Sequence, residues 1–141
     1  MNKVIGLDLG KKTCGIAYSD ALGFVHGIET YRFKAFDFND AANHVDKIAK
    51  EKGITEFALG LPLHLSGNMS EMGNNVLTFK ELLIKLNPSY KITLVDERFS
   101  TVEAHRTLSE LNVSHQQRKD SVDTYAACEI LDTYIRTRSA K

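Results

Sequence analysis

The chain has no excess of charge of either sign, because its 141 residues include 18 lysines and arginines and 18 aspartates and glutamates. A protein that coats nucleic acid is strongly basic, so this class is excluded, whereas an enzyme that touches only a few phosphates is not. Apolar residues make up 43% of the chain and charged residues 26%. These fractions are typical of a globular protein with one sizeable core, and they exclude a chain that is disordered throughout.

Cysteines are scarce, and long apolar runs are absent. Cys14 and Cys128 do not form a C-x-x-C motif or any spacing typical of zinc ligands, and both stand in apolar stretches, so we expect buried free thiols. No apolar run approaches the roughly 20 residues that cross a bilayer. The first residues lack the pattern of a signal peptide. These absences predict a cytoplasmic protein that does not contact a membrane.

The hydrophobic pattern predicts the element order β-β-β-α-β-α-β-α-α. Turn signals separate the first two strands, and capping residues mark the helix ends. Residues 112–119 are polar, and we expect a mobile segment there. The predicted strands cover residues 4–7, 15–18, 24–33, 56–60 and 92–95, and the predicted helices cover 37–52, 70–86, 100–111 and a last segment that opens at Asp120 or Ser121.

This order predicts an α/β fold with a five-stranded mixed sheet, in which the first three strands are antiparallel and helices cover both faces. We expect one domain over residues 1–141, because no linker, repeat or low-complexity segment interrupts the chain. Open sheets of this kind bind ligands at the carboxyl ends of their strands.

Three acidic residues are candidates for a site at that edge. Asp8 and Glu97 each end an apolar strand, and Asp123 lies on the apolar face of the last helix, next to the small residues Ala126 and Ala127. A carboxylate on an apolar strand is costly unless it has a partner such as a metal ion. Two of these acids also have a simpler interpretation, because Asp8 could cap the turn at Gly10 and Glu97 could pair with Arg98.

Two further acids remain unassigned. Asp96 precedes Glu97, and successive residues of a strand face opposite sides of the sheet, so only one of the two can point with Asp8. Asp120 lies on a face similar to that of Asp123 and is a possible auxiliary ligand, or a charge that favours the start of a helix. Carboxylates that converge from separate elements favour Mg²⁺ or Mn²⁺, and a pair of such ions cleaves phosphodiesters without a side-chain nucleophile.

Four ordered blocks of sequence resemble the YqgF/RuvX family, the Holliday-junction-resolvase-like branch of the ribonuclease H superfamily, whose members are also described as pre-16S rRNA nucleases. The resemblance spans about residues 4–135. The blocks are Gly6-Leu7-Asp8-Leu9-Gly10 with Lys12, Gly15-Ile16-Ala17 and Ser19-Asp20; Gly60-Leu61-Pro62-Leu63 with Gly67, Val76 and Phe79; Asp96-Glu97-Arg98-Phe99-Ser100-Thr101 with Ala104; and Asp123 with Ala126-Ala127 and Ile130-Leu131.

The resemblance implies a ribonuclease-H-like fold in which Asp8, Glu97 and Asp123 are the catalytic and metal-binding acids. It also implies that Lys12 and Arg98 lie near the substrate phosphates, and we assign Thr101 to the substrate with them. The implied function is processing of the ends of pre-16S rRNA, and resolution of DNA junctions is the alternative. The implied partners are nucleic acid and ribosomal particles, and we expect a monomer or weak dimer.

Two other interpretations remain open. The motif around Asp8 also resembles the phosphate loop of actin-like and sugar-kinase ATPases, but those proteins need a second such domain and a later glycine-rich loop. The second is a ribosome-assembly or RNA-binding factor without catalysis, which the neutral charge favours mildly. Basic residues gather between 98 and 119, so we expect the polar segment 112–119 to order when nucleic acid binds.

Overall fold

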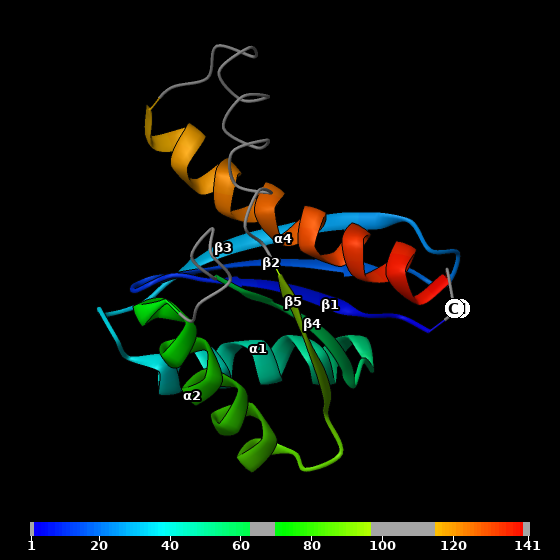
Figure 1. The fold of residues 1–141 in the computed structure, drawn as a ribbon, viewed down its shortest axis with the longest axis horizontal. Helices are drawn as coiled ribbons and strands as arrows, with labels where there is room; N and C mark the ends of the chain where they lie inside the picture. The colour runs from blue at the N-terminus through cyan, green and yellow to red at the C-terminus, as the bar shows by residue number, and fades with distance from the viewer. Residues whose placement is uncertain (1, 63–69, 97–114, 140–141) are drawn as a thin grey trace.

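The computed structural model describes residues 2–62, 70–96 and 115–139. Its five strands form one mixed sheet in the order β3-β2-β1-β4-β5, so β1 lies at the centre (Figure 1). β1 pairs antiparallel with β2 and parallel with β4, and β4 pairs parallel with β5. The strands are β1 (Ile5–Leu9), β2 (Thr13–Ser19), β3 (Val25–Arg32), β4 (Glu56–Leu61) and β5 (Lys91–Asp96).

The helices cover both faces of this sheet. Helices α1 (Phe38–Lys52) and α2 (Glu71–Leu86) pack on one face, and the long helix α4 (His115–Ser139) crosses the other (Figure 1). Ile5 and Leu7 join the core on the α1 and α2 side, whereas Ala17 and Ala58 join the core under α4. The predicted five-stranded mixed sheet with helices on both faces is therefore confirmed.

Local signals place α1 as expected. The Asp37 side chain accepts a hydrogen bond from the amide of Asp40 and so caps the first turn, and Gly53 ends the helix in the left-handed conformation. The apolar face of the helix, which includes Val45 and Ile48, is buried against the sheet. Ser70 caps α2 in the same way, by accepting from the amide of Gly73.

One boundary was predicted wrongly. The last helix begins at His115 rather than at Asp120 or Ser121, so residues 115–119 of the expected mobile segment are helical. The prediction relied on apolar periodicity, which is absent there. Glutamine, arginine and lysine nevertheless have good intrinsic helix propensity, and no glycine or proline interrupts the segment. The predicted helix at 100–111 and most of the predicted loop at 61–68 lie outside the described residues.

None of the helices in the described ranges is long and apolar enough to cross a membrane. Both cysteines are free, as expected; Cys14 is buried, and Cys128 is only partly so.

A hydrogen bond and an ion pair at Asp46 connect α1 to the start of β5. The Tyr90 hydroxyl donates to Asp46 Oδ1, and Lys50 Nζ lies 2.9 Å from Asp46 Oδ2. Burial pushes the pKa of Asp46 up, but the hydrogen bonds from Tyr90 and Lys50 outweigh burial, so the pKa lies below its ordinary value. Burial and the bond to Asp46 raise the pKa of Tyr90 to about 12.

We expect Tyr90→Phe to lower the free energy of unfolding by about 1–2 kcal/mol at neutral pH, because Asp46 then loses a donor to its charged form. A lowered aspartate pKa stabilises the fold above the unfolded-state value, and this contribution disappears as the pH falls through the folded-state value. The difference between variant and wild type should therefore shrink below about pH 4. Urea denaturation as a function of pH measures it, with the exposed Tyr125→Phe as the control. A pH-independent difference would contradict the assignment.

Candidate active site

Asp8 stands near the carboxyl end of the central strand. Ile5, Leu7 and Leu9 of β1 point into the core under α1 and α2. Side chains alternate along a strand, so Asp8 lies on the opposite face, which α4 covers. Gly6 on that face confirms the alternation, since a Cβ there would meet the backbone oxygen of Ala127 at 2.7 Å.

Helix α4 comes closest to the sheet beside Asp8. Gly15 of β2 is the cross-strand partner of Asp8. A Cβ on Gly15 would lie only 2.0 Å from the backbone oxygen of Asp123 and 2.5 Å from its carbonyl carbon. The helix main chain therefore rests directly on the strand main chain, and this contact places Asp123 over the cross-strand partner of Asp8.

Glycines on neighbouring strands extend this close approach. Gly6 and Gly27 both pair with Ala17, so the three residues form a row across β1, β2 and β3. A Cβ on Gly27 would meet Thr124 Cγ2 at 2.7 Å. A glycine inside a strand commonly marks a site where another backbone approaches closely. Together with Gly15, this row forms the surface on which α4 packs, which we call the glycine seat. A larger side chain at any of its glycines would block the contact.

A hydrogen bond fixes the register of α4 on this seat. Thr30 of β3 pairs with Gly15, and its Oγ1 lies 2.8 Å from Thr124 Oγ1. Asp123 precedes Thr124; its side chain is half-buried and its Oδ2 atom is fully buried. The sequence-based expectation that Asp123 faces the sheet is therefore correct.

The pKa of the buried Cys14 thiol is affected by both acids. Burial raises the pKa of its thiol well above the ordinary value, and the negative charges of Asp8, Asp123 and Glu29 raise it further. The thiol stays protonated at neutral pH, which excludes Cys14 as a nucleophile.

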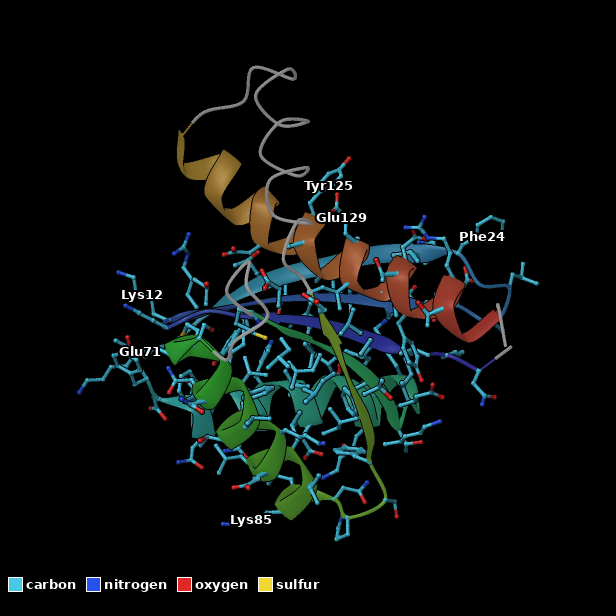
Figure 2. All side chains as sticks on the ribbon, in the orientation of Figure 1. Lys12, Phe24, Glu71, Lys85, Tyr125 and Glu129 are labelled. Carbon is cyan, nitrogen blue, oxygen red and sulfur yellow. The ribbon has the colours of Figure 1, made fainter. Side chains whose placement is uncertain are left out.

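Lys12 lies in the turn that joins β1 to β2, at the same edge of the sheet as the end of β1. It is exposed, and Figure 2 shows its side chain projecting from the molecule. The Gly10 amide donates to the Thr13 carbonyl over 2.7 Å and closes this turn. The turn therefore presents a cation a few residues from Asp8.

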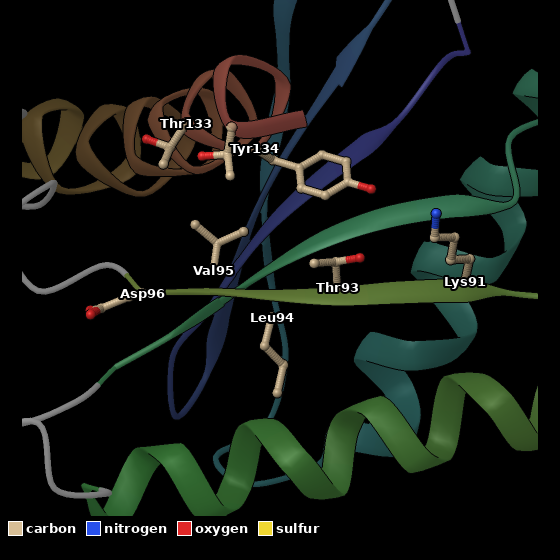
Figure 3. Close-up of a pocket in the computed structure, with 8 residues that line it drawn as sticks. Lys91, Thr93, Leu94, Val95, Asp96, Thr133 and Tyr134 are labelled. Atoms are coloured by element: carbon tan, nitrogen blue, oxygen red, sulfur yellow. The ribbon is translucent and has the colours of Figure 1, made fainter. Parts of the chain in front are cut away.

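The alternation of side chains along β5 indicates which face of the sheet Asp96 occupies. Thr93 and Val95 point toward α4 and Leu94 points toward α2 (Figure 3). Alternation places Asp96 with Leu94, on the face opposite Asp8. Asp96 is also one of the residues that line a cavity of about 520 Å³ between β5 and α4. Glu97, Arg98 and Thr101 lie outside the described residues.

Asp120 belongs to α4, one helical turn before Asp123. Because the helix begins at His115, the interpretation of Asp120 as the opening residue is wrong. The glycine seat and the Thr30–Thr124 hydrogen bond were not predicted from the sequence. A signal for the seat was available, because Gly6 and Gly15 interrupt adjacent predicted strands opposite a helix with paired alanines.

Two solved structures of RuvC have a similar fold. The Thermus thermophilus RuvC structure in complex with a Holliday junction substrate superposes with a TM-score of 0.59 at 12% identity, covering 97% of this chain and 96% of that one. A second Thermus thermophilus RuvC structure gives 0.57 at 10% identity, covering 96% of each chain. At these identities the likeness shows a common fold.

Sequence comparison goes further. A Staphylococcus aureus (strain JH9) protein named "Putative pre-16S rRNA nuclease" is 36% identical over 135 residues, which cover 95% of each chain, and the protein of strain Mu50 matches equally. The family model described as "RuvX: Holliday junction resolvase" matches residues 2–137. The chain therefore belongs to the RuvX family.

Proposed function

We propose that this protein is a metal-dependent nuclease that cuts phosphodiester bonds at the ends of pre-16S rRNA during ribosome biogenesis in the cytoplasm, and that the whole chain acts as one domain. Asp8, Glu97 and Asp123 are the proposed catalytic and metal-binding residues. Family membership supports the reaction class, and the names of the relatives support the substrate.

The observation that carries this proposal is that the Asp123 main chain lies over Gly15, the cross-strand partner of Asp8. Asp8 and Asp123 come from the central strand and from the helix on one face, far apart in sequence. Two carboxylates brought close together repel each other, and a cation that binds both would offset this repulsion. Gly15 permits the close approach, because it places backbone against backbone.

The donor chemistry fits a hard divalent cation. Asp8 and Asp123 supply only oxygen, which Mg²⁺ and Mn²⁺ prefer. Within the described ranges no third histidine, cysteine or acid completes a metal-binding cluster, so the proposal takes the third ligand from Glu97 and an auxiliary one from Asp120. A divalent cation bound there would supply an activated water and charge stabilisation for the leaving oxygen.

The protein itself would hold and orient the substrate. The exposed Lys12 stands in the turn after β1, where a phosphate that approaches Asp8 would meet it. We assign Arg98 and Thr101 the same task from the segment that follows β5. A few such contacts are compatible with a chain of zero net charge, since a bound cation converts the acids into an attractive site for phosphate.

DNA junction resolution is the second candidate function. It is favoured by the description of the matching family model and by the RuvC-like fold. Resolution of a two-fold junction requires two copies of the active site, so this function would need a dimer. Pre-16S rRNA processing needs no such symmetry.

The test is cleavage of a precursor 16S rRNA fragment and of a four-way DNA junction, side by side, with Mg²⁺, Mn²⁺ or EDTA. Asp8→Asn keeps the shape of the side chain and removes its charge. The matched control is Asp132→Asn, because Asp132 is an exposed acid of α4 that pairs with Arg136 at 2.9 Å. We expect RNA cleavage that requires metal, is lost in Asp8→Asn and is retained in Asp132→Asn.

The other outcomes are distinct. Cutting of the junction alone would replace the RNA substrate by DNA and leave the metal site in place. Binding of precursor rRNA or ribosomal particles with no cleavage above the Asp8→Asn background would overturn the enzyme proposal in favour of an assembly factor.

A further inference from the structure

An exposed phenylalanine in an unfavourable backbone conformation lies beside the candidate active site. Phe36, in the loop between β3 and α1, leaves 55% of its surface exposed. Its φ angle is 65°, and it is the only non-glycine residue with a positive φ among the described residues. A bulky residue in this left-handed region costs on the order of 1–2 kcal/mol, and such strain gathers at binding sites.

Hydrogen bonds hold this loop against the turn that follows Asp8. The Phe36 amide donates to the Lys11 carbonyl over 2.7 Å, and the Phe33 amide donates to the Lys12 carbonyl over 3.0 Å. The Phe36 ring meets the Phe38 ring edge-on, with centroids 6.1 Å apart. The ring is therefore held in place, and it lies at the same end of the sheet as Asp8.

The two segments around Phe36 carry three lysines and two aspartates. Lys11, Lys12 and Lys34 are all exposed in the two segments that these hydrogen bonds join. Of the nearby acids, Asp37 caps α1, and Asp40 accepts a hydrogen bond from the Tyr31 hydroxyl over 2.8 Å. Both aspartates keep their charge in these roles, so the three lysines and two aspartates leave a local net charge of +1.

We propose that Phe36 stacks on an unpaired base of the substrate strand, while Lys11 and Lys34 contact the phosphates on either side of that base. An aromatic ring among lysines is the combination with which proteins bind single-stranded nucleic acid, and stacking tolerates any base because every base has a π-face. The inference rests on the proposed function only in that the ligand is nucleic acid. It adds that the strand is single where it passes this loop.

A matched control stands at the other end of the sheet. Phe24 exposes 64% of its surface, and its amide donates to the carboxylate of Asp20, which also pairs with His26. Figure 2 shows Lys12 and Phe24 at opposite ends of the molecule. Phe24 is therefore an exposed phenylalanine that should not contact the substrate.

The experiment measures binding rather than cleavage. A short single-stranded RNA with one 2-aminopurine is titrated in EDTA, with the matching DNA strand in parallel, and both base fluorescence and anisotropy are read. Phe36→Ala should weaken binding about tenfold, which corresponds to about 1.4 kcal/mol, and should abolish the quenching of the base. Phe36→Trp should retain both signals, and Phe24→Ala should match the wild type. Lys34→Gln should reduce the salt slope by about 0.7.

Phe36→Gly separates binding from folding, because glycine adopts the left-handed conformation without strain. It should unfold at higher urea concentration than Phe36→Ala and bind the strand as weakly. Equal binding and quenching in Phe36→Ala and wild type would overturn the proposal. Because no cleavage enters the assay, a Phe36-dependent signal in a protein that cuts nothing would uphold this inference while the proposed nuclease failed.

Discussion

Gly15→Ala should abolish cleavage and lower the free energy of unfolding by at least about 3 kcal/mol. The added Cβ would lie 2.0 Å from the backbone oxygen of Asp123, and a backbone atom cannot turn aside as a side chain can. Helix α4 must then lift from β2, which separates Asp123 from Asp8 and breaks the Thr30–Thr124 hydrogen bond. One methyl group would thus damage both the fold and the site.

Gly53→Ala is the control for a glycine whose substitution leaves the site alone. Gly53 has a φ of 66° at the end of α1, and a Cβ there would meet no atom within 4 Å. Its substitution should cost about 1 kcal/mol through backbone strain and leave cleavage unchanged. Urea denaturation and single-turnover cleavage compare the two variants. A Gly15→Ala protein with near-wild-type activity would show that Asp123 does not need its close seat on β2.

Asp123→Asn should reduce metal-dependent cleavage by about 10²–10³-fold or more, because it removes one charged ligand and with it several kcal/mol of transition-state stabilisation. In EDTA, however, the same variant should be more stable than the wild type by about 1 kcal/mol, since it relieves repulsion between Asp123 and Asp8. Loss of function with gain of stability is typical of a site built for a ligand.

Thermal unfolding with and without Mg²⁺ tests this without any substrate. A cation that binds the folded state raises the melting temperature of the wild type, and the rise should be much smaller in Asp123→Asn. Asp132→Asn should respond to Mg²⁺ like the wild type, because Asp132 pairs with Arg136 at the surface. A Mg²⁺-dependent rise of equal size in Asp123→Asn would contradict its assignment as a ligand.

The sheet and its helices were predictable where local chemistry and periodicity agreed. Asp37 caps the start of α1 and Gly53 ends it, as the capping rules predict. Alternation along β1 places Asp8 on the face opposite Ile5, Leu7 and Leu9. The start of α4 was missed because residues 115–119 are helical without an apolar face to reveal it. Hydrophobic periodicity predicts a helix only where the sequence has an apolar face.

The site was predictable only in part, for a similar reason. Helical spacing and alternation each place one acid, Asp123 and Asp8, on a face that turns out to be shared. The distance between those faces depends on Gly15, whose role is a tertiary contact and not a local preference. The positive φ of Phe36 could not be predicted, because no neighbouring residue indicates it. It accompanies a tertiary hydrogen bond from the Phe36 amide to the Lys11 carbonyl.

The place of β1 in the sheet also bears on how the acids respond to local opening of the fold. β1 is bonded on both sides, to β2 and β4, so local opening moves Asp8 less readily than a residue on an edge strand. Among the described strands β5 is bonded on one side only, and Glu97 follows it in the sequence. The proposed cation would therefore join the most persistent strand of the protein to the continuation of one of its edges, and its release would free the edge first.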